Sequence, residues 1–571
     1  MKKKVLIGLL GIATAAVMLT GCGGKKDSEE KKEPQEKEEA FEEDFPEEED
    51  AEDGDFFEEE EEEETDTAPE TAGVPCLEAW IKSVYETTDD GGTILLKGSY
   101  EVPVLTEKSA EEFPELAAAL LDAAKTNRST FRGDIEDEIS AAKEQLSEVP
   151  ESFGDGMFYS DNTKVLPQRV DGKVTSFFYS FSNYTGGAHG MYGQRGETYD
   201  TKTGEALALT DILTDTDGFD GIVRGELLEA YGEDFFGDLD EALSSYDPGL
   251  TDYSDGGESG EASFAYNWAL SPEGLVLYFG PYSLASYAQG AQTVCLSYDK
   301  YPELFEEKYL PGESDPFMLR FDFTIEGIDV DGDGKSDSLT IDSKYSDDYS
   351  VIEGIDLMVN ETESEAFKDV DIWPDSEKYG YYLKTRDGKQ YVYVILQRES
   401  DYEEVLVFEL KDGKARPVDS QWFSRGIRID EDDDGYFERL LTNPDRMSFA
   451  TKFDFLSSFT AERNYSVGED GMPVSGEDYY TLVTDAAPEP LKAKTELDAK
   501  VLDDDGAETG EETVIKKGDE FNVIGTDGKS LLDVKLTDGT KLRLSITSVE
   551  YPCEINGIVD SDCVEQVWYA G

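Results

Sequence analysis

The stretch Tyr184-Thr185-Gly186-Gly187-Ala188-His189-Gly190 contains the only histidine of the chain. An aromatic, alternating segment precedes it at 174–182 and predicts a half-buried strand, and the segment that follows at 195–200 predicts another. Two adjacent glycines can adopt positive φ angles or let another backbone come close. We therefore expect a corner between two strands that places the His189 side chain at the rim of a sheet.

The segments around this corner predict an α+β domain. The residues 200–205, Asp-Thr-Lys-Thr-Gly-Glu, are typical of a tight turn. Apolar spacing predicts helices at 110–125, 135–146 and 220–231, and strands at 93–104, 264–270 and 274–279. Strands beside a few helices predict an antiparallel sheet with helices on one face.

Several of these motifs together resemble the RsiV-like family. They are Tyr-Thr-Gly-Gly-Ala-His at 184–189, Asp-x-Lys-Thr-Gly-x-x-Leu-x-Leu-x-Asp-Ile-Leu at 200–213, Gly274 to Phe279, Pro281-Tyr282, Tyr287-Ala288 and Gly290. In that family the domain is the extracellular part of RsiV-type anti-sigma factors, where it is a lysozyme receptor, and an accessory region of PdaC-type peptidoglycan deacetylases. The resemblance spans Thr93 to Phe305 and implies a lysozyme-binding domain.

The composition excludes several classes of partner. The net charge of −81 argues against nucleic acid and against docking on anionic lipid, since both need Lys and Arg on the protein. Cationic proteins and divalent metal ions are the partners that this charge favours. A hydrophobic content of 38% is sufficient for folded, β-rich domains, so much of the acid belongs to solvated surface and tails.

The N-terminus resembles a bacterial lipoprotein signal. Lys2-Lys3-Lys4 precedes the apolar run 5–18 and the lipobox Leu19-Thr20-Gly21-Cys22. The apolar run is shorter than the roughly 20 residues that a membrane-spanning helix needs. We expect cleavage before Cys22, lipid attached to its sulfur, and a protein exported to the cell envelope on the outer face of the cytoplasmic membrane.

The chain is predicted to contain several domains, because 571 residues exceed one core. Residues 1–21 form the predicted signal peptide, and the acidic segment 22–73 is expected to be a disordered stalk below the anchor. The RsiV-like domain is assigned to 74–312 and a β-rich domain to 313–487. Residues 488–571 are assigned to a small β domain that weakly resembles an SH3-like barrel.

Two acidic loops in the β-rich domain predict calcium sites. In both loops, acidic residues stand at positions one, three, five and nine and glycine stands at position six, as in calcium loops. Position twelve lacks the glutamate of an EF-hand, so these loops instead resemble the strand-flanked DxDxDG loops of bacterial surface proteins. An acidic turn without a metal ion is the alternative. The predicted ligands are Asp329, Asp331, Asp333 and Asp337 in the first loop and Asp430, Asp432, Asp434 and Glu438 in the second.

The cysteines are consistent with an exported protein. Without Cys22, four of the five cysteines remain, an even number. We expect Cys553 to pair with Cys563, and Cys76 with Cys295. The alternative is that all four remain free, partly buried thiols.

No recognised catalytic motif is present. A Ser-His-Asp or Cys-His hydrolase would have to use His189, and a metal-dependent deacetylase would need several His and Asp ligands. We therefore expect a non-catalytic binding protein. The predicted binding residues, whose alternative role is to hold the sheet and its loops in place, are Tyr184, Gly186, Gly187, His189, Tyr192, Arg195, Tyr282, Tyr287 and Gln289.

Three functions remain open. The first is a surface lipoprotein that binds lysozyme or another wall-active protein, without control of a sigma factor, because no cytoplasmic part is expected before Cys22. The second is a calcium-stabilised envelope protein that binds wall glycan or a surface partner. The third is an unrecognised hydrolase that acts on peptidoglycan.

Overall fold

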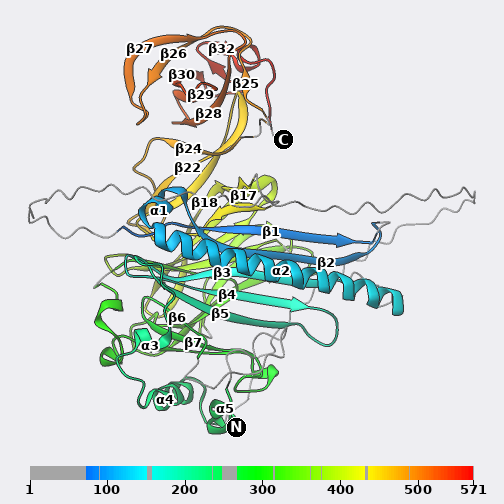
Figure 1. Ribbon diagram of the computed structural model, residues 1–571, viewed down its shortest axis with the longest axis vertical. Coiled ribbons are helices and arrows are strands. Elements are labelled where there is room, and N and C mark those ends of the chain that lie inside the picture. Colours follow the sequence, from blue (N-terminus) through cyan, green and yellow to red (C-terminus); the bar gives the residue numbers. More distant parts are fainter. Residues whose placement is uncertain are drawn as a thin grey trace, which may run out of the picture. The chain divides into compact units, whose positions relative to one another are not determined.

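Figure 1 shows the computed structural model, which describes residues 73–569 apart from 89–90, 151–152, 154–156, 234–235, 247–265, 313–314, 361, 375, 431–434, 486 and 488. The predicted signal, Cys22 and the acidic stalk up to residue 72 lie outside the described residues, as do Asp432 and Asp434. No helix in these described ranges is both long enough and apolar enough to cross a bilayer. Strands hold 48% of the residues and helices 18%, so the protein is mostly β and the predicted α+β class holds only in part.

The predicted corner belongs to a seven-stranded sheet with the order β19-β20-β1-β2-β3-β4-β5. All neighbours are antiparallel except β2 and β3, which run parallel with Leu96 opposite Tyr159. Two helices between these strands return the chain to the same end of the sheet, which makes a parallel pair possible. The sheet is therefore mixed, which corrects the antiparallel prediction. The strands are β1 (Leu77–Thr87), β2 (Ile94–Leu105), β3 (Tyr159–Val170), β4 (Val174–Tyr184), β5 (Met191–Asp200), β19 (Arg428–Ile429) and β20 (Tyr436–Arg439).

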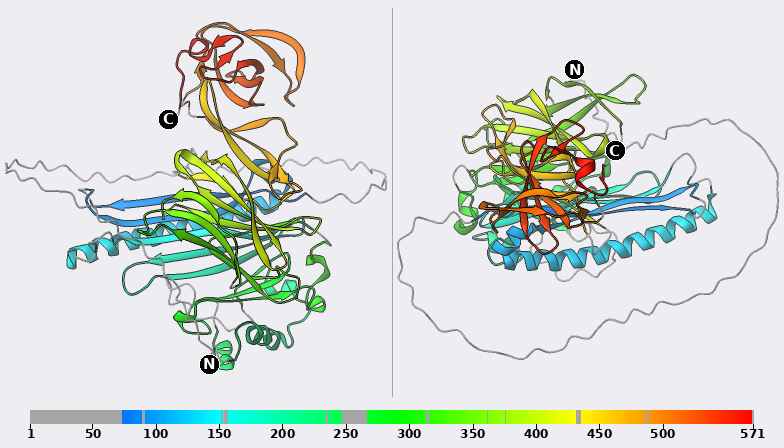
Figure 2. Two further views of the ribbon diagram at one scale, coloured as in Figure 1. Left: turned by 180° about the vertical axis from the view of Figure 1, so that it is seen from behind. Right: turned by 90° about the horizontal axis from the view of Figure 1, so that it is seen from above.

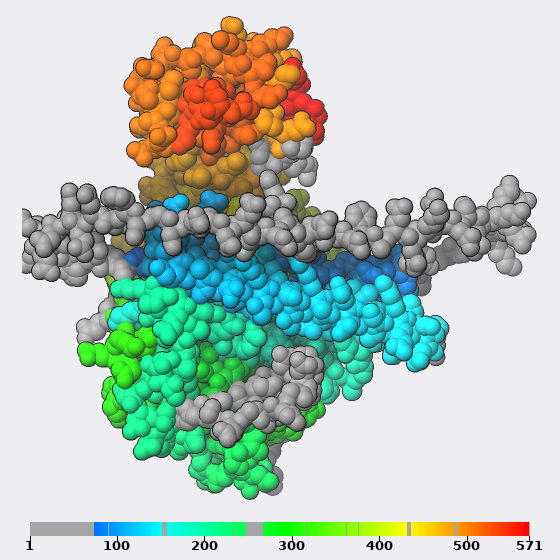
Figure 3. Space-filling model, viewed as in Figure 1, coloured from blue at the N-terminus to red at the C-terminus, as the bar shows by residue number. Residues whose placement is uncertain are grey.

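One long helix replaces the two helices predicted at 110–125 and 135–146. After the short α1 (Glu107–Glu112), α2 (Pro114–Glu148) runs along one face of the sheet, as Figures 2 and 3 show. Gly133, between the two predicted helices, lies on the exposed side of α2 and costs only about 1 kcal/mol there. Phe131 and Ile135 on either side of it are buried, so the apolar stripe continues and the helix does not break.

A three-stranded sheet packs on the opposite face. It consists of β6 (Trp268–Leu270), β7 (Gly274–Phe279) and β8 (Gln292–Ser297). Close packing depends on Gly196 of β5, where a Cβ would lie 1.7 Å from the Trp268 carbonyl oxygen. On the outer side of this small sheet lie α3 (Leu209–Ile212), α4 (Phe219–Tyr231) and α5 (Leu239–Ser244). Helices thus cover both outer faces, which corrects the prediction of helices on one face.

The next segment forms a β-sandwich. One layer pairs in the order β9-β15-β16-β17-β18, and β10 to β14 form the other. Leu339, Ile355, Val394 and Phe408 belong to the core between the layers. The strands are β9 (Phe317–Phe321), β10 (Thr324–Ile328), β11 (Asp337–Tyr345), β12 (Ile352–Val359), β13 (Thr362–Glu363), β14 (Phe367–Ile372), β15 (Lys378–Lys384), β16 (Gln390–Gln397), β17 (Tyr402–Lys411) and β18 (Lys414–Ser424).

The remaining strands continue from β18. The last part has its own core, and its strands pair in the order β27-β26-β30-β29-β28. Its likeness to an SH3 barrel stays a prediction. The elements are β21 (Met447–Phe455), β22 (Ser457–Val467), β23 (Pro473–Val474), β24 (Tyr480–Asp485), β25 (Leu491–Lys492), β26 (Leu497–Leu502), β27 (Glu508–Ile515), β28 (Glu520–Thr526), β29 (Leu531–Leu536), β30 (Lys541–Ser548), β31 (Glu554–Ile555), β32 (Ile558–Val559) and α6 (Asp560–Cys563).

Candidate functional site

The predicted corner and the loop after β7 meet in an exposed aromatic cluster. The His189 ring stacks on Tyr287, with the ring centroids 3.8 Å apart and an interplanar angle of 20°. The rings of Tyr192 and Tyr282 lie 6.0 Å and 5.4 Å from the Tyr287 ring. We call His189, Tyr192, Tyr282 and Tyr287 the aromatic corner.

Glycines set the path of the backbone at this corner. Gly186 and Gly187 have φ angles of 95° and 97°, which glycine adopts without steric cost. A Cβ on Gly190 would lie 2.4 Å from the Asn183 carbonyl oxygen, so this close approach also requires glycine. The Tyr184 hydroxyl donates to the Gly187 carbonyl at 3.1 Å. These residues therefore shape the turn that presents His189.

The loop after β7 supplies the other half of the cluster. Tyr282 is 53% exposed and has a φ angle of 70°, a strained conformation of the kind that is often found at functional sites. The Tyr287 hydroxyl donates to the Gly190 carbonyl at 2.8 Å and so ties the loop to the corner. Gln289 accepts from the backbone N–H and the hydroxyl of Ser286, at 3.0 Å and 2.8 Å. Gln289 thus holds the turn that carries Tyr287.

Arg195 is the predicted binding residue that the structure separates from this cluster. Its guanidinium lies 5.0 Å from the centroid of the Tyr179 ring and 3.2 Å from the Glu197 carboxylate. It also donates to Asn127 of α2 at 3.3 Å. Arg195 therefore faces the helix side of the sheet, while Tyr192, three residues earlier, faces the loop after β7.

The surroundings of His189 suit binding by contact. Its Nδ1 lies 3.0 Å from the Gly190 carbonyl oxygen, and its ring contacts are with tyrosines. Tyrosine faces attract ammonium and guanidinium groups, and tyrosine hydroxyls form hydrogen bonds at the edges of contacts. Burial raises the pKa of Tyr192, so that its hydroxyl stays protonated at neutral pH. The cluster can thus offer both stacking faces and hydrogen-bond donors.

The first acidic loop brings three of its four predicted ligands together. Carboxylate oxygens of Asp329, Asp331 and Asp333 all lie within 4.8 Å of one another. Carboxylates of this kind suit a hard divalent cation such as Ca²⁺. An ion pair with Lys335 at 2.9 Å lowers the pKa of Asp333. Asp337 instead accepts from the Val330 N–H, at 2.9 Å, and from the Asn360 amide, at 2.8 Å.

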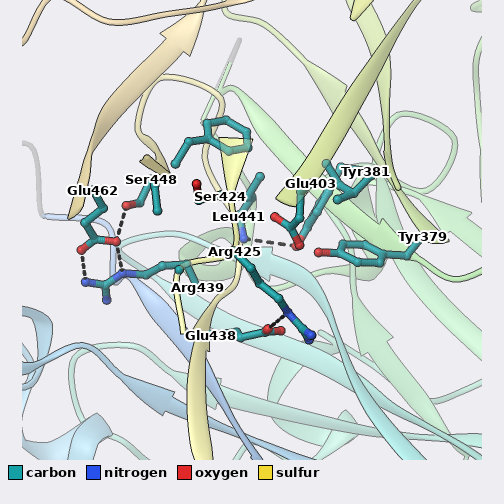
Figure 4. A pocket seen from close by; sticks show the side chains of 14 residues that line it. Tyr379, Tyr381, Glu403, Ser424, Arg425, Glu438, Arg439, Leu441, Ser448 and Glu462 are labelled. Atoms are coloured by element: carbon teal, nitrogen blue, oxygen red, sulfur yellow. Dashed lines mark hydrogen bonds and ion pairs between the residues drawn. The ribbon is translucent and has the colours of Figure 1, made fainter. Parts of the chain in front are cut away.

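The second acidic loop is different. The Trp80 indole N–H donates to the Asp430 carboxylate at 2.7 Å. Glu438 lies in β20 and forms an ion pair with Arg425 in the interior, as Figure 4 shows. Asp430 and Glu438, the first and last residues of this predicted site, therefore have separate partners. The reason is that β20 joins the N-terminal sheet and directs Glu438 inward.

The interior around Glu438 contains a small polar cavity that sequence reasoning missed. Its volume is about 50 Å³, and Tyr379, Glu403, Arg425 and Arg439 are among its lining residues (Figure 4). Burial, followed by the charge of Glu438, raises the pKa of Glu403 to about 7. Since one buried water needs about 10 to 15 Å³ of such space, this cavity has room for water. The sequence signal that could have identified this cavity is the charged Glu403 beside the apolar residues of the strand Tyr402–Lys411.

All four described cysteines are free thiols, which corrects the two expected disulfides. The sulfurs of Cys553 and Cys563 each contact a different backbone carbonyl at 3.5 Å. Cys76 precedes β1 of the large sheet, whereas Cys295 lies in β8 of the three-stranded sheet. Burial raises the pKa of Cys563 to about 11, so this thiol is protonated at neutral pH.

A comparison with protein families assigns part of this region. Residues 231–299 match a family described as a protein of unknown function, DUF3298, which is related to RsiV- and PdaC-type domains. The match includes Tyr282 and Tyr287 but not the segment around His189. The match supports the predicted resemblance at the level of a DUF3298 domain, which is related to the RsiV-like family.

Two solved structures are similar to the chain. A DUF3298 family member from Bacteroides fragilis has 16% identity and a TM-score of 0.30, and the match covers 42% of this chain and 96% of the other. A DUF3298 family protein from Pseudomonas aeruginosa has 17% identity and a TM-score of 0.28, with 42% and 99% covered. Among curated proteins none matches.

Proposed function

We propose that this chain is a non-catalytic binding protein of the bacterial cell surface, and that its aromatic corner contacts a cationic, wall-active protein such as lysozyme. One observation carries the proposal. Gly190 and Tyr287, which are 97 positions apart in sequence, are hydrogen-bonded, and the predicted binding residues His189 and Tyr282, which are exposed, form one cluster with the half-buried Tyr287. The resemblance to the RsiV-like family suggests lysozyme as the partner.

The physical properties of the site agree with a cationic partner. Tyrosine is a frequent anchor of protein interfaces, and its ring attracts Lys and Arg side chains. The net charge of −81 would speed the encounter with a basic protein. The same charge disfavours nucleic acid as a partner.

We place the protein in the cell envelope. The lipobox at Cys22 supports export and attachment by lipid to the outer face of the cytoplasmic membrane, and the acidic segment after it would hold the folded part away from the bilayer. Mass spectrometry of the mature protein tests this, since a lipid on Cys22 at the new N-terminus is expected.

The binding proposal is tested by calorimetric titration of lysozyme into residues 73–571, which belong to one compact unit. The acidic stalk is omitted because a polyanion binds any basic protein, and physiological salt weakens such binding further. We expect micromolar or tighter one-to-one binding that Tyr282→Ala and His189→Ala each weaken about tenfold. Tyr85→Ala removes a comparably exposed tyrosine elsewhere and should change nothing. Equal affinity in all variants would reject the aromatic corner.

A second proposal concerns calcium. The clustering of Asp329, Asp331 and Asp333 favours a calcium-stabilised envelope protein, which could bind wall glycan or a surface partner through its β-rich half. Binding to the folded state alone raises stability by about 2.7 kcal/mol at 100 times the Kd. Ca²⁺ should therefore raise the Tm of the wild type above its value in EDTA, but not that of Asp331→Asn. Asp505→Asn, in another acidic turn, is the control, and equal Tm values for the wild type with and without Ca²⁺ would reject the site.

A further inference from the structure

Two exposed tryptophans belong to the β-sandwich formed by β9 to β18. Trp373, which follows β14, is 59% exposed, and Trp422, in β18, is 55% exposed. The other three tryptophans are buried or half-buried. Tyr402, at the start of β17, is also exposed, and its ring centroid lies 6.4 Å from that of Trp422. Figure 1 shows β17 and β18 as neighbours. Exposed indole rings of this size are common anchors of interfaces.

Arg398 connects these rings. Its guanidinium donates to the carbonyl oxygens of Val370 and Asp371, just before Trp373. It forms an ion pair with the buried Glu404 and lies 5.1 Å from the centroid of the Trp422 ring. The guanidinium is thus held by fixed partners beside the Trp422 ring, and one of them, Asp371, is two residues before Trp373. We call Trp373, Arg398, Tyr402 and Trp422 the tryptophan surface.

The turns that carry this surface are strained. Asp369 and Asp371 before Trp373, and Ser400 and Asp401 before Tyr402, have φ angles between 49° and 60°. In the described ranges, ten residues other than glycine have positive φ angles, and these four are among them. Such strain costs about 1 to 3 kcal/mol per residue and persists where the surroundings impose it, often at binding sites.

The rim of the surface is acidic. Exposed carboxylates stand on the same turns and strands as the rings, and the charge of Arg398 is already balanced by Glu404. These carboxylates are Asp369, Asp371, Glu399 and Asp401. Such a rim repels anionic polymers and complements a cationic ligand. Charge complementarity therefore selects a basic partner.

The ring geometry favours a cationic side chain over a sugar. The Tyr402 and Trp422 rings are inclined at 60° to each other, so they do not form a flat platform for a pyranose. The Trp422 ring already faces a guanidinium, that of Arg398, and indole is the best aromatic partner for a cation. We propose that the tryptophan surface binds a lysine- and arginine-rich segment of a protein, whose cations lie on the indole faces and against the acidic rim.

Acrylamide quenching of tryptophan fluorescence tests this in residues 73–571, because the quencher reaches exposed indoles first and the acidic stalk would bind any cationic peptide. The probe is a peptide of alternating lysine and glycine at physiological salt. Bound peptide should shield Trp373 and Trp422 and lower the quenching. The shielding should vanish in a Trp373→Ala, Trp422→Ala double variant, and each single variant should bind the peptide about tenfold more weakly.

Three further variants test whether peptide binding depends on the tryptophan surface and its acidic rim. Tyr349→Ala removes an aromatic side chain that is 70% exposed elsewhere and should leave peptide binding unchanged. His189→Ala should also leave it unchanged, which separates this surface from the aromatic corner. Asp371→Asn with Asp401→Asn keeps the rings and should weaken binding several-fold. Unaltered quenching in the presence of the peptide, or shielding by a neutral chitin oligosaccharide instead, would overturn the proposal.

Discussion

Gly204 closes the turn that follows β5, with a φ angle of 66°. The predicted tight turn is confirmed, because the Asp200 carboxylate accepts from the N–H groups of Lys202 and Thr203, both at 3.0 Å. A Cβ on Gly204 would lie 2.4 Å from the Glu115 carbonyl oxygen in α2. Glycine is therefore favoured at this position for two reasons, the left-handed backbone and the close contact with the helix.

Gly204→Ala should lower the free energy of unfolding by more than 2 kcal/mol, because the left-handed conformation alone costs about 1 to 2 kcal/mol and the clash adds to it. Gly518→Ala is the matched control, since its φ angle is 91° but nothing lies within 4 Å of the added Cβ. It should lose about 1 kcal/mol. Urea titrations measure both values, and equal losses would show that the contact with α2 is unimportant.

Glu403 is one of the residues whose protonation links stability to pH. Its pKa rises from 4.5 to about 7, because burial and the nearby Glu438 disfavour its charged form. The charges of Arg425 and Arg320 oppose this shift, while Glu377 adds to it. Between pH 4.5 and about 7 the folded chain binds a proton that the unfolded chain has released, so this residue makes stability fall as pH rises.

Glu403→Gln should remove this contribution. Between pH 5 and pH 8 the free energy of unfolding should fall less in the variant than in the wild type. The difference between the two proteins should be largest at the higher pH. Glu353→Gln, at an exposed position, is the control. Thermal unfolding across this range gives the difference directly, and parallel curves for wild type and Glu403→Gln would contradict the assignment.

At the scale of elements, α2 shows how a helix continues past an unfavourable residue. Leu116, Leu120, Phe131 and Ile135 are buried along one side of its 35 residues. The Phe131 ring stacks on Tyr100 of β2, with centroids 4.4 Å apart. Packing of this stripe against the sheet outweighs the low helix propensity of Gly133. Helix length is therefore set by the sheet as much as by the helix sequence.

Phe131→Ala should lower the free energy of unfolding by about 3 kcal/mol, as expected when a buried aromatic ring leaves a cavity. Leu121→Ala removes an apolar side chain of the same helix that is 48% exposed, and it should change stability by less than about 0.5 kcal/mol. Chemical denaturation measures both. A small effect of Phe131→Ala would mean that the middle of α2 does not hold the helix to the sheet.

At the scale of the whole chain, segments far apart in sequence share one sheet. β20 pairs with β1, with Tyr436 opposite Ile81. The buried Glu78 carboxylate lies 2.8 Å from the Arg428 guanidinium and 2.9 Å from that of Arg439. Strands from the predicted β-rich domain thus complete the sheet of the predicted RsiV-like domain.

Glu78→Gln should lower stability by about 1 to 2 kcal/mol, because the partly exposed guanidinium groups of Arg428 and Arg439 lose a buried anionic partner. Glu508→Gln is the matched control, as its ion pair with Lys500 at 2.8 Å is exposed. Exposed pairs contribute about 1 kcal/mol or less. Hydrogen exchange of the β1 amides should also quicken in Glu78→Gln alone, and unchanged exchange would show that β1 does not depend on this contact.

Local patterns in the sequence predicted much of this protein. The alternation at 174–182, the helix at 220–231 and the turn at 200–205 agree with β4, α4 and the observed hydrogen bonds, because each depends on neighbours a few residues away. The acidic spacing at 329–333 likewise brings three carboxylates together within one loop. Such features follow from backbone preferences and short-range side-chain chemistry.

Only the tertiary structure decided which distant segments meet. The stacking of His189 on Tyr287, the joining of β20 to β1 and the inward position of Glu438 all depend on how sheets and loops pack. The residue spacing within one segment does not predict its packing contacts, since these depend on the shape and charge of surfaces formed elsewhere in the chain. The sequence by itself determined the local turns and strands of this protein, whereas long-range packing determined its aromatic corner and its buried charges.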